Sequence, residues 1–262
     1  MNKKLPLRQV LLVFVLGVIG IASMAQPIFT NPITGTNPDA LNPYTLGQSI
    51  DVNLTVSGIG RGSGIAGTNT NDRYNATGWN SAAFDATDYF EFTIAPKSGA
   101  KINFVGFVYN GQAFPGGPTN FAFRSSIDGY AANIGVPTAN GTTILLSAAA
   151  FQGVTSAVTF RFYGWGATLG SGTFSINDFT FNGNVLPIIP QFYRSKNSGD
   201  WNTVRTWQFS PDNITWSNST LVPTSLEKSV TILASHIVTA AASISLDETT
   251  ISVPFSYCRE EY

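Results

Sequence analysis

The chain has 262 residues, which is enough to bury one large hydrophobic core or two smaller ones. Only 11% of the residues are charged, 13% are aromatic, and 14 Lys and Arg residues balance 15 Asp and Glu residues. This even balance argues against binding to nucleic acid through phosphate neutralisation, and the low charge is typical of extracellular all-β proteins.

The N-terminus has the pattern of a signal peptide. Basic residues precede an apolar run at positions 10–21, and small residues follow at 23–25. The apolar run is too short to span a bilayer, which requires about 20 residues. We expect residues 1–25 to be removed so that the mature chain begins at Gln26, with an uncleaved anchor as the alternative. No later stretch is long enough for a transmembrane helix, so the sequence predicts a secreted protein, extracellular or at the cell surface.

The segment 88–110 carries the clearest β pattern in the chain. Phe90, Phe92 and Ile94 alternate with more polar residues, which predicts a strand with one buried face. Residues 102–109 are apolar in both phases, which predicts a central strand covered on both faces. Pro and Gly residues between the two runs predict a turn, and therefore an antiparallel hairpin.

Further strands are predicted along the chain by alternation between turn residues. In the run V-T-F-R-F-Y, Phe160 and Phe162 are expected on one face and Arg161 and Tyr163 on the other. The remaining predicted strands lie at 50–56, 121–125, 142–146 and 174–181. Residues 26–47 are interpreted as an extended lead-in, 58–67 as a flexible Gly-rich connection, and 147–153 as one helical turn. Seven to nine short strands without a long helix predict an antiparallel, jelly-roll-like β-sandwich over residues 26–186.

A second, smaller β domain is predicted after a proline-flanked linker at 187–195. Residues 196–254 are rich in Trp and then show short apolar alternations, which suit the first rungs of a β-solenoid. Solenoids need about three repeats to bury their faces, so this domain is expected to be incomplete. Residues 255–262 form an irregular tail that indicates truncation. The tail contains the single cysteine, Cys258, which has no internal partner and is free to pair with another chain.

Several segments resemble a known family. The stretches 42–62, 71–79, 88–94 and 160–167 together resemble the N-terminal β-sandwich module of large secreted surface proteins from Bacteroidota. The stretches 193–216 and 229–239 are similar to the Trp-rich segment that leads into repeat regions in the same proteins. The resemblance implies type IX secretion and an adhesive or glycan-associated role, although the sorting domain common in this family is missing here. It supplies no catalytic residues.

No catalytic constellation is predicted. The only histidine, His236, is interpreted as a polar residue at the edge of a β rung, because zinc sites and nucleophilic triads need partners that the chain lacks. A hydrolase acting through Asp85, Asp88 and Glu91 is the third hypothesis for function. Asp88 and Glu91 are expected on opposite faces of a strand, which argues against their cooperation.

Two kinds of ligand site are predicted from the loops. Asp72, Asp85 and Asp88 lie in or beside one loop and offer the oxygen ligands that calcium prefers, so calcium is the candidate cofactor. Five aromatic residues are expected at strand ends or in loops, where their rings can stack on a sugar: Trp79, Tyr109, Tyr130, Tyr163 and Trp165.

The leading hypothesis is therefore a secreted, non-enzymatic module for surface adhesion or binding, with an extracellular glycan or a surface protein as its partner. The alternative is a carbohydrate-binding accessory module of a larger extracellular protein.

Overall fold

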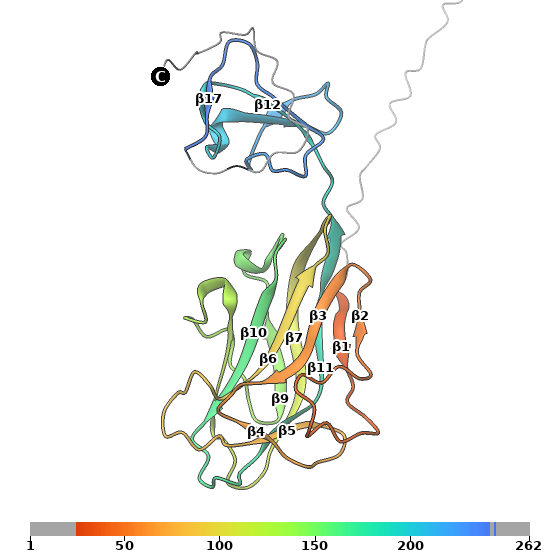
Figure 1. Cartoon of the computed structure of the whole chain (residues 1–262), viewed down its shortest axis with the longest axis vertical. Coiled ribbons are helices and arrows are strands. Elements are labelled where there is room, and N and C mark those ends of the chain that lie inside the picture. The colour runs from red at the N-terminus through yellow and green to blue at the C-terminus, as the bar shows by residue number, and fades with distance from the viewer. Residues whose placement is uncertain (1–24, 242–243, 245–262) are drawn as a thin grey trace, which may run out of the picture.

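The computed structural model describes residues 25–241 and residue 244, and these residues form an all-β protein (Figure 1). The predicted signal peptide and Cys258 lie outside the described residues. Among the residues described, no helix has the length and apolar character needed to cross a membrane. The strands are β1 (Gln26–Asn31), β2 (Ser49–Ile50), β3 (Leu54–Arg61), β4 (Ala66–Gly67), β5 (Tyr74–Thr77), β6 (Tyr89–Pro96), β7 (Ala100–Ala113), β8 (Asn120–Ser125), β9 (Gly141–Leu145), β10 (Val158–Trp165), β11 (Phe174–Pro187), β12 (Phe192–Ser195), β13 (Gly199–Asp200), β14 (Trp207–Ser210), β15 (Ser217–Asn218), β16 (Ser229–Thr231) and β17 (Val238–Thr239). Three short 3-10 turns join them: η1 (Ser126–Asp128), η2 (Ala149–Phe151) and η3 (Val204–Thr206).

The larger body is a sandwich of two antiparallel sheets, as predicted. One sheet has the strand order β3-β6-β10-β8, and we call it sheet B. The other, sheet A, has β11 at its centre, paired with β1, β5 and β7. From β2 onward the chain passes repeatedly from one sheet to the other, which is the connectivity expected of a jelly-roll-like fold.

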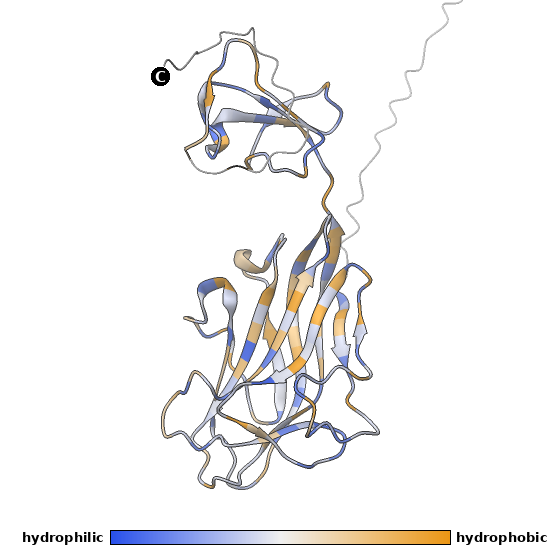
Figure 2. Cartoon of the chain, in the orientation of Figure 1, coloured by the Kyte–Doolittle hydropathy of each residue, from blue (hydrophilic) through white to orange (hydrophobic). Residues whose placement is uncertain are grey.

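Aromatic side chains fill the space between the two sheets. Phe92 of sheet B packs 5.2 Å from Phe107 of sheet A, and Phe160 packs 5.4 Å from Phe104, measured between ring centroids. These rings are fully buried. Figure 2 shows hydrophobic residues alternating with hydrophilic ones along the strands, which is the pattern that gives each sheet one buried face.

The predicted hairpin over residues 88–110 is wrong, although both of its strands exist. β6 pairs with β3 and β10 in sheet B, whereas β7 pairs with β9 and β11 in sheet A. The turn at 97–99 therefore crosses between the sheets. The apolar side chains of β6 and β7 point toward the same core from opposite sheets. In a hairpin, the two strands would lie side by side in one sheet.

The prediction that β7 is covered on both faces is also wrong, and a β-bulge explains the misleading pattern. Asn182 pairs with Gly106 but Gly183 pairs with Phe104, so Val105 is an extra residue in β7. Before the bulge, the even-numbered residues Ile102 and Phe104 point into the core. After it, the odd-numbered residues Phe107 and Tyr109 do so. The opposite face is open to solvent at Val108, which is 36% exposed.

Three further expectations need correction near the N-terminus. The presumed lead-in contains β1, which pairs with β11 in sheet A. The predicted strand at 50–56 breaks at a turn, so that β2 joins sheet A and β3 joins sheet B. The Gly-rich stretch 58–67 is not simply a flexible connection, because its ends belong to β3 and β4. The strands predicted near 121, 142, 158 and 174 and the helical turn at 147–153 are all present.

The smaller body has its own core of Tyr193, Trp201, Trp207 and Val230, and it lies beyond the end of β11 in Figure 1. β12 pairs in parallel with β16, and β13 pairs in parallel with β17. Stacked coils of a solenoid produce parallel pairs of this kind. However, β12 also pairs antiparallel with β14, and β14 with β15, so the solenoid-like start stays a prediction.

Candidate functional site

The outer face of sheet B carries the most unusual group of side chains outside the core. Along β10, Phe160 and Phe162 point inward, and Arg161, Tyr163 and Trp165 lie on the outer face. The positions of Arg161 and Tyr163 on the face opposite the two phenylalanines were predicted. Arg161 lies opposite Glu91 of β6 and Arg124 of β8. An outer sheet face is usually covered by small polar residues, and this one is instead rich in aromatic and arginine side chains.

Aromatic rings from two strands and a loop contact one another on this face. Phe84, from the loop before β6, has its ring centroid 4.9 Å from that of Tyr163 and 5.7 Å from that of Trp165. Tyr89 of β6 lies 5.5 Å from Tyr163 on the other side. Tyr163 is thereby almost covered, whereas Phe84 is 38% exposed and Trp165 is half-buried.

Two arginines are stacked against these rings. The guanidinium carbon of Arg161 lies 4.1 Å from the ring centroid of Tyr89 and 4.2 Å from that of Tyr130, which folds over the sheet from the loop after η1. The guanidinium carbon of Arg124 lies 4.2 Å from the ring centroid of Phe84. We call this group the outer-face cluster, and its members are Phe84, Tyr89, Glu91, Arg124, Tyr130, Arg161, Tyr163 and Trp165.

The cluster is held in a defined geometry by polar contacts. Arg161 Nε forms an ion pair with Glu91 Oε2 at 3.3 Å. Arg124 Nε donates to Asn133 Oδ1 at 2.7 Å, and its Nη1 donates to the Tyr130 carbonyl at 3.0 Å. Burial raises the pKa of the Tyr89 and Tyr163 hydroxyls, so both phenols keep their protons at neutral pH. The face therefore combines rigid ring surfaces with hydrogen-bond donors.

The structure brings together three of the five predicted aromatic residues: Tyr130, Tyr163 and Trp165. The other two belong to the core between the sheets, which corrects the prediction for them. Trp79 is fully buried and donates its Nε1 hydrogen to the Ala76 carbonyl at 2.8 Å. Tyr109 is buried, its hydroxyl donates to the Thr138 carbonyl at 2.6 Å, and burial raises its pKa to about 12. Neither ring has a face open to a ligand.

The three predicted calcium ligands do not form one site. Asp72 Oδ1 accepts a hydrogen bond from the Gly35 backbone N–H at 2.6 Å in a different loop region. Asp85 Oδ1 accepts from the backbone and hydroxyl of Thr87, and Asp88 Oδ2 accepts from the Ser81 hydroxyl at 2.8 Å. Across the described part of the chain, no three His, Cys, Asp or Glu side chains are grouped as a metal site would require.

Of the three carboxylates considered for hydrolysis, Asp88 and Glu91 are separated by the sheet, whereas Asp85 lies close to the buried Asp88 and both interact with Ser81. Asp88 is 2% exposed and lies directly beneath Gly64. A Cβ atom added to Gly64 would lie 2.0 Å from Asp88 Oδ1. Burial raises the pKa of Asp88. Glu91 projects from the outer face and is paired with Arg161. The two carboxyl groups therefore do not face a common space.

His236 has a partner that the sequence did not reveal. Its Nδ1 lies 2.9 Å from the Ser195 hydroxyl, which also accepts a hydrogen bond from the Leu233 backbone N–H at 2.8 Å. Ser195 is completely buried, so a substrate cannot reach it as a nucleophile. The contact links β12 to the connection between β16 and β17.

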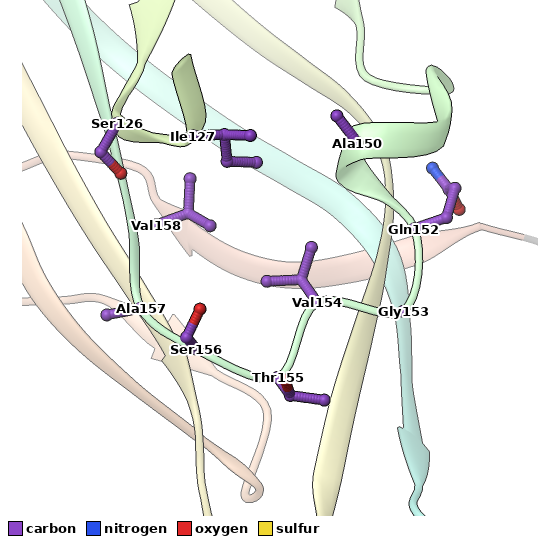
Figure 3. A pocket seen from close by; sticks show the side chains of 10 residues that line it. All are labelled: Ser126, Ile127, Ala150, Gln152, Gly153, Val154, Thr155, Ser156, Ala157 and Val158. Atoms are coloured by element: carbon purple, nitrogen blue, oxygen red, sulfur yellow. The ribbon is translucent and has the colours of Figure 1, made fainter. Parts of the chain in front are cut away.

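A separate hollow of about 470 Å³ lies between η1 and η2 (Figure 3). It is lined by Ser126, Ile127, Ala150, Gln152, Gly153, Val154, Thr155, Ser156, Ala157 and Val158. None of these side chains is an acid or a base. Gln152 Nε2 donates to the carbonyls of Phe104 and Leu146, and Ser126 Oγ accepts from the Thr159 N–H. The hollow thus offers less chemistry than the outer-face cluster.

Sequence reasoning missed several members of the outer-face cluster: Phe84, Tyr89, Arg124 and Arg161. The alternation in β6, β8 and β10 contained part of the signal, because it places Tyr89, Arg124 and Arg161 on the faces opposite the buried phenylalanines. Their proximity depends on the pairing of β10 with both β6 and β8, which only the structure supplies. Phe84 lies in a loop without periodicity.

No match to this chain was found among protein families, curated proteins or solved structures. The resemblance to surface proteins of Bacteroidota therefore stays a prediction.

Proposed function

We propose that the chain is a secreted, non-enzymatic module that adheres to an extracellular carbohydrate through the outer-face cluster. The observation that carries this proposal is the group of aromatic rings and arginines on the outer face of sheet B. Partly exposed apolar rings on a sheet face commonly mark an interaction site. Their flat surfaces match the C–H faces of pyranose rings, and their neighbouring donors match sugar hydroxyl groups.

The rigidity of the cluster supports a binding role. Phe84, Tyr130 and Trp165 are held by ring contacts and by stacked guanidinium groups, so little side-chain freedom is lost when a ligand binds. A secreted location, predicted from the N-terminal sequence, would expose this face to glycans of a surface or matrix.

Hydrolysis through carboxylates has less support. Glycoside hydrolysis uses two carboxyl groups about 5 to 9.5 Å apart across the scissile bond. Asp88 lies beneath Gly64 and Glu91 is paired with Arg161 on the outer face, so this pair does not offer an acid and a nucleophile to one substrate. These contacts favour a binding module over an enzyme of this type.

A glycan-array screen of the full chain tests the proposal, with Trp165→Ala as the variant of the cluster. Trp216→Ala is a matched control, because Trp216 is also a half-buried tryptophan but belongs to the smaller body. There the guanidinium carbon of Arg194 lies 4.2 Å from its ring centroid. Loss of one stacking ring is expected to weaken binding about tenfold. We expect this loss for Trp165→Ala and unchanged binding for Trp216→Ala.

A flat array, or equal binding by both variants, would contradict the proposal and favour a protein partner instead. Repeating the screen with and without calcium tests the predicted cofactor in the same format.

A further inference from the structure

We infer that the outer-face cluster selects an acidic polysaccharide, with Arg124 pairing the carboxylate or sulfate group of a sugar whose ring stacks on Phe84 and Trp165. This inference rests on the proposed carbohydrate-binding function and names the class of ligand.

The first step is the charge of the cluster. It contains two guanidinium groups, Arg124 and Arg161, and a single carboxylate, Glu91. Glu91 is paired with Arg161 at 3.3 Å, and this is the single ion pair found among the residues that the structure describes. One positive charge is therefore in excess, and it belongs to Arg124.

The second step is the hydrogen bonding of Arg124. Its two bonds go to neutral acceptors, Asn133 Oδ1 and the Tyr130 carbonyl, through Nε and Nη1. A guanidinium group has five N–H donors in a planar fork that matches carboxylate and sulfate oxygens. The bonds to Asn133 and Tyr130 orient the fork and leave three N–H groups for a ligand.

The third step is the environment of this charge. Arg124 stacks on Phe84, which is 38% exposed, and Phe84 contacts the half-buried Trp165. A cation beside partly exposed rings matches a ligand that is apolar on one face and anionic at its rim. An acidic sugar has this character, whereas a neutral sugar would leave the positive charge without a partner.

The carboxylates of the flanking loops form their hydrogen bonds elsewhere than with Arg124. Asp128 accepts hydrogen bonds from the backbone N–H groups of Ala131 and Ala132 in its own loop. Asp85 accepts from the backbone and hydroxyl of Thr87. Both side chains are hydrogen-bonded within their own turns, and neither forms an ion pair with Arg124 in the described part of the chain.

The test compares charged polymers with neutral polymers of the same backbone. Titration calorimetry on the full chain measures the affinity for each polymer. The salt concentration is about 0.15 M, at which charges are screened beyond about 8 Å. Polygalacturonate is compared with its methyl ester, and dextran sulfate with dextran. We expect at least one acidic polymer to bind about tenfold more tightly than its neutral counterpart. The first pair reports on carboxylate groups and the second on sulfate groups.

The variant Arg124→Gln is expected to remove the preference for the acidic polymer. Arg194→Gln is the matched control, because Arg194 also stacks on an aromatic ring, that of Trp216, and donates its Nε hydrogen to a side-chain amide, that of Gln208. Arg124→Lys retains the charge but loses the planar fork, and it decides the matter if Arg124→Gln unfolds: a weakened or lost preference supports the inference, and an unchanged preference overturns it.

The outcomes separate the two proposals. Equal affinity for neutral and acidic polymers, still lost in Trp165→Ala, would overturn the acidic ligand and leave carbohydrate binding intact. Binding that is insensitive to Trp165→Ala, or absent for every polymer, would overturn both. A preference lost in Arg194→Gln rather than in Arg124→Gln would move the site to the smaller body and overturn this assignment.

Discussion

Arg61 is a buried cation whose hydrogen bonds all go to backbone carbonyl groups. Its guanidinium group also lies 3.7 Å from the ring centroid of Tyr74. Only 8% of the residue is exposed, so these carbonyls replace water around the charge. The accepting residues are Pro38, Asp39, Leu41 and Asn75, at distances of 2.9 to 3.4 Å. Arg61 thereby attaches the segment after β1 to β3 and β5.

Arg61→Met is expected to destabilise the protein by about 3 kcal/mol, because several buried carbonyls lose their donor at once. Urea denaturation followed by circular dichroism measures this change. Lys101→Met is the control, since Lys101 lies half-exposed on the outer side of β7 and its loss should cost no more than about 0.5 kcal/mol. Equal stability of the two variants would show that Arg61 has no such role.

At the scale of the strands, bulges determine which side chains reach the core. Asn177 is an extra residue in β11 opposite Asn110 and Gly111, and it shifts the inward phase from Ile176 to Phe179. A third bulge in β3 contains Gly58, whose φ is +84°. There the Thr93 backbone N–H donates to the Ser57 hydroxyl instead of to a strand carbonyl.

Gly58→Ala is expected to destabilise the sandwich by about 3 kcal/mol, because positive φ is unfavourable for alanine and the new Cβ meets a neighbour. That Cβ would lie 2.3 Å from the Tyr44 carbonyl oxygen. Gly99→Ala is the control, since Gly99 also has positive φ, +78°, but no atom lies within 4 Å of the added methyl group.

The control should cost only about 1 kcal/mol. Thermal unfolding of both variants measures the difference. An equal cost for the two would mean that the close approach of Tyr44 to β3 contributes nothing.

The strands were predictable from the sequence because alternation is a local property, and their partners were not. Phe90, Phe92 and Ile94 are buried on one face of β6, as their spacing predicts. Whether β6 pairs with β7 or faces it across the core depends on contacts with β3, β10 and β11. The bulge at Val105 reverses which residues of β7 point inward. In the sequence, the apolar residues before and after the bulge therefore occupy both alternating positions, which is the pattern of a strand buried on both faces.

The candidate site was predictable only in part for the same reason. Tyr163 and Trp165 belong to a strand whose outward phase was visible in the sequence. Trp79 and Tyr109 looked like loop residues but are core residues, because their polar atoms find buried backbone partners at Ala76 and Thr138. Thr138 is 29 residues from Tyr109, and a partner that distant has no signature in a single sequence.

At the scale of the whole molecule, the two bodies have separate cores. The larger core consists mainly of phenylalanine rings between two sheets. The smaller core is built around Trp201 and Trp207, whose ring centroids lie 4.7 Å apart. Trp207 Nε1 donates to the Trp201 carbonyl at 2.8 Å, so Trp207 both fills space and satisfies a buried acceptor.

Calorimetry of the full chain is expected to resolve two unfolding transitions, since separate cores unfold independently. Trp207→Phe should destabilise only the smaller body, by about 2 kcal/mol, because it loses volume and a hydrogen bond. Phe160→Leu is the reciprocal variant, as Phe160 is fully buried in the larger core. A single transition that both variants shift equally would show that the two bodies unfold as one.

The antiparallel pairing of β1 with β11 determines how the sandwich would respond to a pulling force. Gln26 at the start of β1 lies opposite Gly183 near the end of β11, so the chain enters and leaves the sandwich at the same end. Tension between the N-terminal side and the smaller body would open the β1/β11 hydrogen bonds one after another, as in a zipper. In this loading direction the sandwich would yield gradually under low force and absorb a pull before sheet B is strained.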